Sequence, residues 1–167
     1  MPGAEPLPPQ APWLSAAAVA LAVGLLESHR RHFGRPLIAC RATDGRQQAQ
    51  ELFVAATVVL AHDGSADPRL IYANAAALRL WRHRWSSMVG MPSRLTAEPA
   101  ERQARARQLN TVLQQEFISG YRGIRIDGDG RRFQIEGARL WNLPAGPGQH
   151  PGDAPGQAAA FSSWAWL

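Results

Sequence analysis

Few residues of this chain have a type and spacing that suggest chemistry. His29 and His32 lie three residues apart in a segment with helical character, a spacing that can hold a metal ion. No further cysteine, histidine or acid pattern supports them, so two solvated histidines near a helix C-terminus are the favoured interpretation, and no metal site is predicted. Cys40 is the single cysteine, which excludes an intramolecular disulfide and fits a reducing compartment.

A general acid–base pair is the remaining catalytic option. His62 and Glu136 could serve one substrate only if both side chains face the same cavity. For Glu136, an ion pair with Arg139 or Arg125 is favoured over a functional acid. The sequence has no nucleophile elbow, no phosphate-binding glycine loop and no pair of carboxylates at a telling spacing. We therefore predict no catalytic residues and no enzyme, and keep a small enzyme using His62 and Glu136 as the alternative.

A pocket between a sheet and its helices is the site that the remaining residues favour. Aromatic and apolar walls with a few fixed polar groups are typical of ligand sites. The predicted lining is Tyr72, Trp81, Trp85, Phe117, Trp141 and Trp164, with His62, Asn74, Asn142 and Ser162 as polar groups. Aromatic residues at such spacings are also core residues, and helix capping by itself explains Asn74. A filled core is therefore the competing interpretation.

Residues 57–85 are expected to position this pocket. The apolar, β-branched run at 57–62 predicts a buried strand, and the turn formers at 63–68 reverse the chain. Residues 70–72 form the return strand. Asn74 then caps a helix from Ala75 to about His83.

The other elements follow from periodicity and breakers. Residues 1–12 are proline-rich and predict a disordered tail. Residues 13–33 predict a helix that ends at Gly34 and packs on its own domain, with a helix at 47–54 and another at 99–119. Strands are expected at 121–126, after the turn at 127–130, and at 158–166, with a β-bulge at Gly137. The expected units are a tail (1–12), an N-terminal helix and linker (13–46) and a core (47–167).

The motifs along the chain resemble those of a known family. Tyr72-Ala73-Asn74 with Leu80-Trp81 resembles the first helix of the MEKHLA domain, a PAS-like family. The segments 92–99, 120–126, 130–136, 140–142 and 156–162 resemble further family motifs in the same order. The resemblance covers about residues 25–164 and implies an α+β, PAS-like fold. The implied fold consists of a five-stranded antiparallel sheet with helices on one face, preceded by an N-terminal helix.

The same resemblance implies a non-enzymatic sensory or regulatory module that binds a small ligand or a protein partner. The family also occurs at the end of plant class III homeodomain–leucine-zipper transcription factors. Cys40 lacks the Asn-Cys-Arg motif of flavin-binding photosensory relatives, and the helix at 99–119 contains no histidine to ligate haem. The cofactor therefore stays unknown. No output segment is recognised, so a separate partner, or a homodimer through the 13–33 helix, is expected to carry the signal.

The charge and the hydropathy of the chain restrict the partners and the compartment that we expect. The net charge is +5, every basic residue is arginine, and the arginines are scattered, so solvated surface charge is favoured over nucleic-acid binding. The apolar run at 14–26 is shorter than the roughly 20 residues of a membrane span. It also lacks the positive start of a signal peptide. We expect a cytoplasmic protein with no membrane partner.

Overall fold

The computed structural model describes residues 11–146, 149–150 and 153–167, so most of the expected tail lies outside the described residues. Its helices are η1 (Pro12–Leu14), α1 (Ala16–Phe33), α2 (Gly45–Val54), α3 (Ala75–Trp81), α4 (Trp85–Met88), η2 (Ser93–Thr96) and α5 (Pro99–Gln115). Its strands are β1 (Val58–His62), β2 (Leu70–Ala73), β3 (Phe117–Ile126), β4 (Arg132–Asn142), β5 (Gln157–Phe161) and β6 (Ser163–Trp166).

The strands form one antiparallel sheet in the order β2-β1-β5-β4-β3. The predicted strand at 158–166 is divided at Ser162 into β5 and β6, which is why the sheet has six strands. Both pieces run along β4 in one register, with Arg139 opposite Ala160 and Glu136 opposite Ser163. The predicted α+β, PAS-like fold is confirmed.

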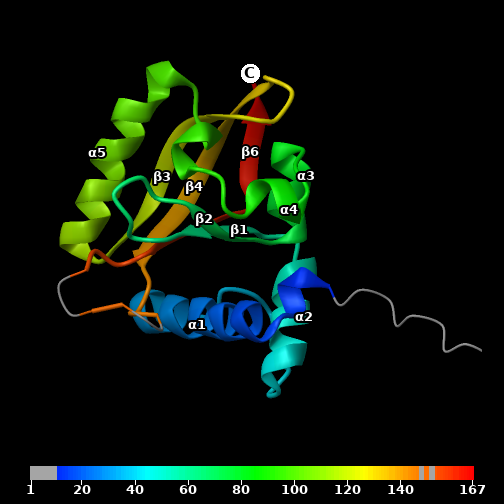
Figure 1. Ribbon diagram of the computed structural model, residues 1–167. Coiled ribbons are helices and arrows are strands. Elements are labelled where there is room, and N and C mark those ends of the chain that lie inside the picture. The colour runs from blue at the N-terminus through cyan, green and yellow to red at the C-terminus, as the bar shows by residue number, and fades with distance from the viewer. Residues whose placement is uncertain (1–10, 147–148, 151–152) are drawn as a thin grey trace, which may run out of the picture.

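Helices cover both faces of the sheet (Figure 1), whereas the prediction placed the helices that follow the N-terminal helix on one face; α2 instead lies beside α1 on the other face. The inner face, which carries Val58 and Leu140, packs against α3 and α5. The outer face, which carries Val59 and Trp141, packs against α1 and α2. Leu25 of α1 is completely buried there, so α1 packs on its own domain as predicted. Because both faces are covered, β1 is apolar at consecutive positions rather than at alternate ones.

Local signals set most helix ends. Ser15 caps α1 by accepting from the backbone N–H of Ala18, and Gly34 ends the helix with φ 69°. α5 ends at Gln115, earlier than the predicted residue 119. Glu116 adopts φ 72° and turns the chain out of the helix, so Phe117 begins β3 instead of packing as a helical residue.

The register of β3 against β4 shifts at Tyr121, which lies opposite Ala138. Gly137 has φ 63°, so the β-bulge predicted there is confirmed. Among the helices of the described residues, none combines the length and the apolar character needed to cross a bilayer.

Candidate ligand-binding site

A small cavity of about 40 Å³ lies between the inner face of the sheet and α5. Strands β1 to β5 supply most of its wall, and α5 closes it. The lining residues are Leu60, His62, Leu70, Trp81, Thr96, Arg105, Gln108, Leu109, Tyr121, Arg125, Ile135, Leu140, Gln157, Ala158, Ala159 and Phe161. Of the ten residues predicted to line a pocket, only His62 and Trp81 are among them.

Three of the predicted aromatic residues lie on the opposite side of the sheet. Tyr72 and Trp141 belong to the core beneath α1 and α2, and Trp85 packs against the same core. The rings of Tyr72 and Trp85 pack edge to face, with their centroids 5.7 Å apart. Successive strand residues face opposite sides, so Trp141 points outward because Leu140 points inward.

Two further aromatic residues are partly exposed. Phe117 contacts Phe33 of α1 and is 41% exposed. Trp164 lies on β6, is 38% exposed, and packs against Trp166. Ser162 is exposed and shares a hydrogen-bond contact of 3.3 Å with the hydroxyl of Thr57. The prediction that these residues share one pocket with His62 is wrong, because the two faces and the rim of the sheet separate them.

The two predicted asparagines have structural positions. Asn74 is fully buried and links four backbone groups, two as acceptor and two as donor. The Oδ1 atom of Asn142 accepts from Nε2 of Gln157, which also donates to the carbonyl of Leu109 on α5. Asn142 therefore supports a cavity residue without lining the cavity.

His62 places an unpaired acceptor at the cavity. Its Nδ1 lies 2.8 Å from the carbonyl oxygen of Asp63, which can only accept, so Nδ1 carries the proton. Nε2 is then a bare acceptor, buried and without a partner among the described residues. Burial lowers the pKa of His62, with a further lowering from the charge of Arg105, so the ring is neutral near pH 7.

Arg125 is a buried cation in the cavity wall. It lies on the inner face of β3 and is only 8% exposed. Its guanidinium donates to the hydroxyl of Tyr121 at 2.9 Å and to its neighbouring carbonyl, Ile124 O, at 2.9 Å. Gly123 makes room for this arrangement, since a Cβ there would lie 2.4 Å from Tyr121 Oη and 2.8 Å from Arg125 Nη1.

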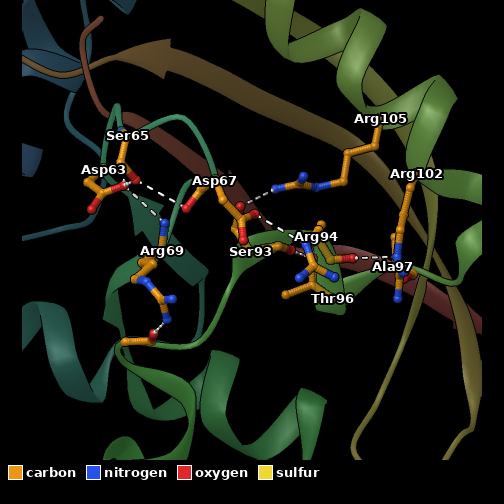
Figure 2. A network of polar contacts seen from close by, with 11 residues as sticks. Asp63, Ser65, Asp67, Arg69, Ser93, Arg94, Thr96, Ala97, Arg102 and Arg105 are labelled. Carbon is orange, nitrogen blue, oxygen red and sulfur yellow. Dashed lines mark hydrogen bonds and ion pairs between the residues drawn. The ribbon is translucent and has the colours of Figure 1, made fainter. Parts of the chain in front are cut away.

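Arg105 reaches the same cavity from α5 and ties it to a surface network. Its Nη2 donates to Ser93 Oγ at 3.0 Å, and Figure 2 shows this side chain extending from α5 toward η2. Arg102 secures the same connector through the carbonyls of Arg94 and Ala97. Arg94 in turn pairs with Asp67 of the β1–β2 loop at 3.2 Å (Figure 2).

The acid–base pair considered for an enzyme is not assembled. His62 lines the cavity on the inner face, whereas Glu136 follows the inward-facing Ile135 and is exposed on the other side. Glu136 pairs with Arg122 at 3.5 Å, and not with either of the two arginines expected from the sequence. Because the two groups cannot reach one substrate, this catalytic alternative is wrong.

The α1 histidines also differ from expectation. His29 is completely buried, with Nδ1 at 3.1 Å from the Arg35 carbonyl and Nε2 accepting from Arg139. The prediction that it is solvated is wrong, since helix α1 lies on the sheet. Across the described residues, no group of three or more His, Cys, Asp or Glu side chains gathers to hold a metal ion.

The polar residues of the actual cavity escaped the sequence analysis. Arg105 and Arg125 look like the other scattered arginines, and only the packing of α5 over β3 brings them together. The alternation of Ile124 and Ile126 favours those residues as the buried face of β3. The structure instead turns Tyr121 and Arg125 inward, and no local signal reveals that choice.

A family model for the MEKHLA domain matches residues 19–166. This chain belongs to the MEKHLA domain family. No curated protein sequence matches the chain.

Solved structures similar to this MEKHLA domain share its fold at low sequence identity. A PAS domain from Colwellia psychrerythraea has 14% identity and a TM-score of 0.57, over 69% of this chain and 92% of that one. A fungal LOV domain photoreceptor has 14% identity and a TM-score of 0.56, over 92% and 95% of the two chains. The LOV protein of Rhodobacter sphaeroides has 16% identity and a TM-score of 0.51, over 65% and 59%. These likenesses establish a PAS-like fold.

The LOV neighbours raise the question of a flavin, which the cavity of this MEKHLA domain does not fit. A volume of about 40 Å³ holds a few water-sized groups, far less than a three-ring cofactor. Cys40 lies between α1 and α2 and does not line the cavity. Burial raises the pKa of its thiol, with a further contribution from Glu51, which disfavours the reactive thiolate.

Proposed function

We propose that this MEKHLA domain is a non-enzymatic sensory or regulatory module whose input is a small molecule bound beneath α5. The observation that carries the proposal is Nε2 of His62, a buried acceptor without a partner at the wall of a cavity. Leaving such a group unpaired costs about 1–3 kcal/mol, and a bound donor would remove that cost. The single free cysteine fits action in the cytoplasm.

The position of the cavity supports a regulatory role. Arg105 belongs both to its wall and to the network that holds η2, so occupancy of the cavity can influence the connector between β2 and α5. The connector then meets the β1–β2 loop through Arg94 and Asp67. We propose that a protein partner reads this surface. Self-association through the stripe of α1 is not proposed, because Leu25 is fully buried within the domain.

Native mass spectrometry of freshly purified protein, followed by denaturation, tests the proposal. We expect a stoichiometric small molecule that is released when the chain unfolds. His62→Leu should lose it while keeping the fold, because the apolar side chain fills the same space without an unpaired acceptor. Phe117→Leu is the control, since this residue lies away from the cavity, and it should retain the ligand.

Two results would contradict the proposal. One is a wild-type chain that carries nothing and whose melting temperature responds to no member of a small-metabolite library. The other is full ligand retention by His62→Leu, which would place the site elsewhere.

A further inference from the structure

The charges around the cavity go beyond the existence of a ligand and indicate its chemical class. Arg125 is more than nine-tenths buried, and both of its hydrogen-bond acceptors are neutral oxygens. None of the ion pairs formed by the described residues includes Arg125 or Arg105. A buried cation without a counter-charge is costly, so the site lacks an anion.

The second arginine strengthens this argument. Burial lowers the pKa of Arg105 to about 10, and the charge of Arg125, which lines the same cavity, contributes to the lowering. Glu101, one turn earlier on α5, lines the groove outside the cavity but forms no ion pair with Arg105. Arg105, Arg125 and Tyr121 line both the cavity and this groove, so the groove gives a ligand its entrance.

We infer that the ligand is a short carboxylate that also carries a hydroxyl or similar donor. Arg105 and Arg125 bind its carboxylate, and Nε2 of His62 accepts from its donor. This inference rests on the proposed function, because it assigns the chemistry of the ligand in the same cavity.

Size and wall polarity select a carboxylate among the anions that arginine binds. The planar guanidinium fork matches the two oxygens of a carboxylate. Leu60, Ile135 and Leu140 form apolar walls that suit a short carbon chain and would leave further oxygens of a phosphate without donors. The small volume restricts the ligand to a few non-hydrogen atoms.

Calorimetric titration of the whole chain at constant ionic strength tests the assignment with four probes. Sodium glycolate and sodium lactate carry both groups, sodium acetate lacks the hydroxyl, and glycolamide lacks the charge. We expect one of the hydroxy acids to bind most tightly, acetate to bind about tenfold more weakly, and glycolamide to give no signal. Inorganic phosphate serves as the competing anion.

Variants separate the buried charge from general positive charge. Arg125→Met should weaken hydroxy-acid binding at least tenfold and leave the fold intact, because it removes an unpaired buried cation. Arg79→Met on α3, which is exposed and lines neither the cavity nor the groove, should leave affinity unchanged. If Arg125→Met does not fold, Arg105→Met on α5 provides the same test.

The failures of the two proposals can be told apart. Equal binding of glycolamide, equal or tighter binding of phosphate, or no binding by any carboxylate overturns the assignment of the ligand class. If native mass spectrometry then releases a neutral molecule whose retention depends on His62, the ligand-binding function stands and only its chemistry is wrong. If nothing is released and no metabolite stabilises the chain, both proposals fail.

Discussion

Arg139 of β4 donates from Nε to Nε2 of His29 on α1 across 2.8 Å, joining residues 110 positions apart in the chain. Nδ1 of the same ring lies 3.1 Å from the carbonyl of Arg35, so both ring nitrogens are occupied only when His29 is neutral. His29, one turn before the C-terminus of α1, thus attaches the helix to the outer face of the sheet. Burial, and then the charge of Arg139, lower the pKa of His29 to about 4.

This pKa predicts a loss of stability in mild acid. The unfolded chain binds a proton at His29 below about pH 6.5, whereas the folded chain resists protonation down to about pH 4. The contribution of His29 to the free energy of unfolding should therefore be constant above pH 6.5. Between pH 6.5 and 4 it should fall, by at most about 3 kcal/mol. Urea denaturation of the wild type and of His29→Gln over this range measures it.

The difference between the two proteins is the informative quantity, because burial lowers the pKa of His62 in the same direction. His29→Gln should show a shallower decline than the wild type. His150→Gln, at an exposed position, should follow the wild-type curve. Parallel curves for wild type and His29→Gln would contradict the assignment.

The contact between Trp141 and Ser28 predicts a second attachment of α1 to the sheet, beside that of His29. Trp141 is fully buried, and its Nε1 donates to Ser28 Oγ at 2.9 Å. Ser28→Ala leaves this N–H buried and unpaired, so the free energy of unfolding should fall by about 1–3 kcal/mol. In the Trp141→Phe background the same substitution should cost much less. Additive losses in this double-mutant cycle would show that the hydrogen bond contributes nothing.

Asn74 is expected to be among the most sensitive positions outside the cavity. Oδ1 accepts from the backbone N–H groups of Val59 and Ala77, and Nδ2 donates to the carbonyls of Leu52 and Thr57. Asn74→Ala strands these buried groups, so the expected loss is about 3 kcal/mol or more, above the roughly 0.5–2 kcal/mol of an ordinary cap. Denaturant unfolding at pH 7 measures this loss.

Asp44 provides the matched control because it caps α2 from an exposed position with a single contact, to Arg46 N at 3.3 Å. Asp44→Ala should cost about 1 kcal/mol or less. Similar losses of stability in Asn74→Ala and Asp44→Ala would mean that Asn74 acts only as a cap.

Gly123 is predicted to govern the cavity rather than the fold. The atoms that an added Cβ would meet are the ends of Tyr121 and Arg125, which can move away. Gly123→Ala should therefore leave the free energy of unfolding within about 1 kcal/mol while weakening carboxylate binding about tenfold. Gly24→Ala in α1 meets nothing within 4 Å and should stabilise the chain by about 0.5–1 kcal/mol with unchanged binding. Normal affinity in Gly123→Ala would disconnect Arg125 from the ligand.

Local sequence signals were sufficient for the first hairpin and the helix that follows it. The turn formers after His62 and the cap at Asn74 act over a few residues, so they can be recognised in the sequence without knowledge of the fold. The apolar stripe of α1 was legible for the same reason. Motifs spread along the whole chain then supplied the PAS-like fold through the family resemblance.

The lining of the cavity depends on which face each strand turns toward α5, and that information is not local. In a sheet covered on both sides, neighbours such as Leu140 and Trp141 are equally apolar yet lie in different cores. The prediction therefore favoured large aromatic residues, although three of the six belong to the outer core or pack against it. Arg105 and Arg125 were overlooked because a charged residue is by default assigned to solvent.

The irregular pairing near Tyr121 bears on how this sheet meets other chains. A rim of free N–H and C=O groups is a template on which a foreign strand can add. At the β2 rim, the backbone groups of Leu70 are already hydrogen-bonded to the connector that follows β2. The Leu70 N–H donates to the carbonyl of Met91, and the Leu70 carbonyl accepts from the N–H of Gly90. The β3 rim is interrupted by the register shifts around Tyr121 and by Gly120 at φ 71°. The bulge that shapes the cavity wall therefore also breaks the straight run of groups that sheet-to-sheet aggregation requires.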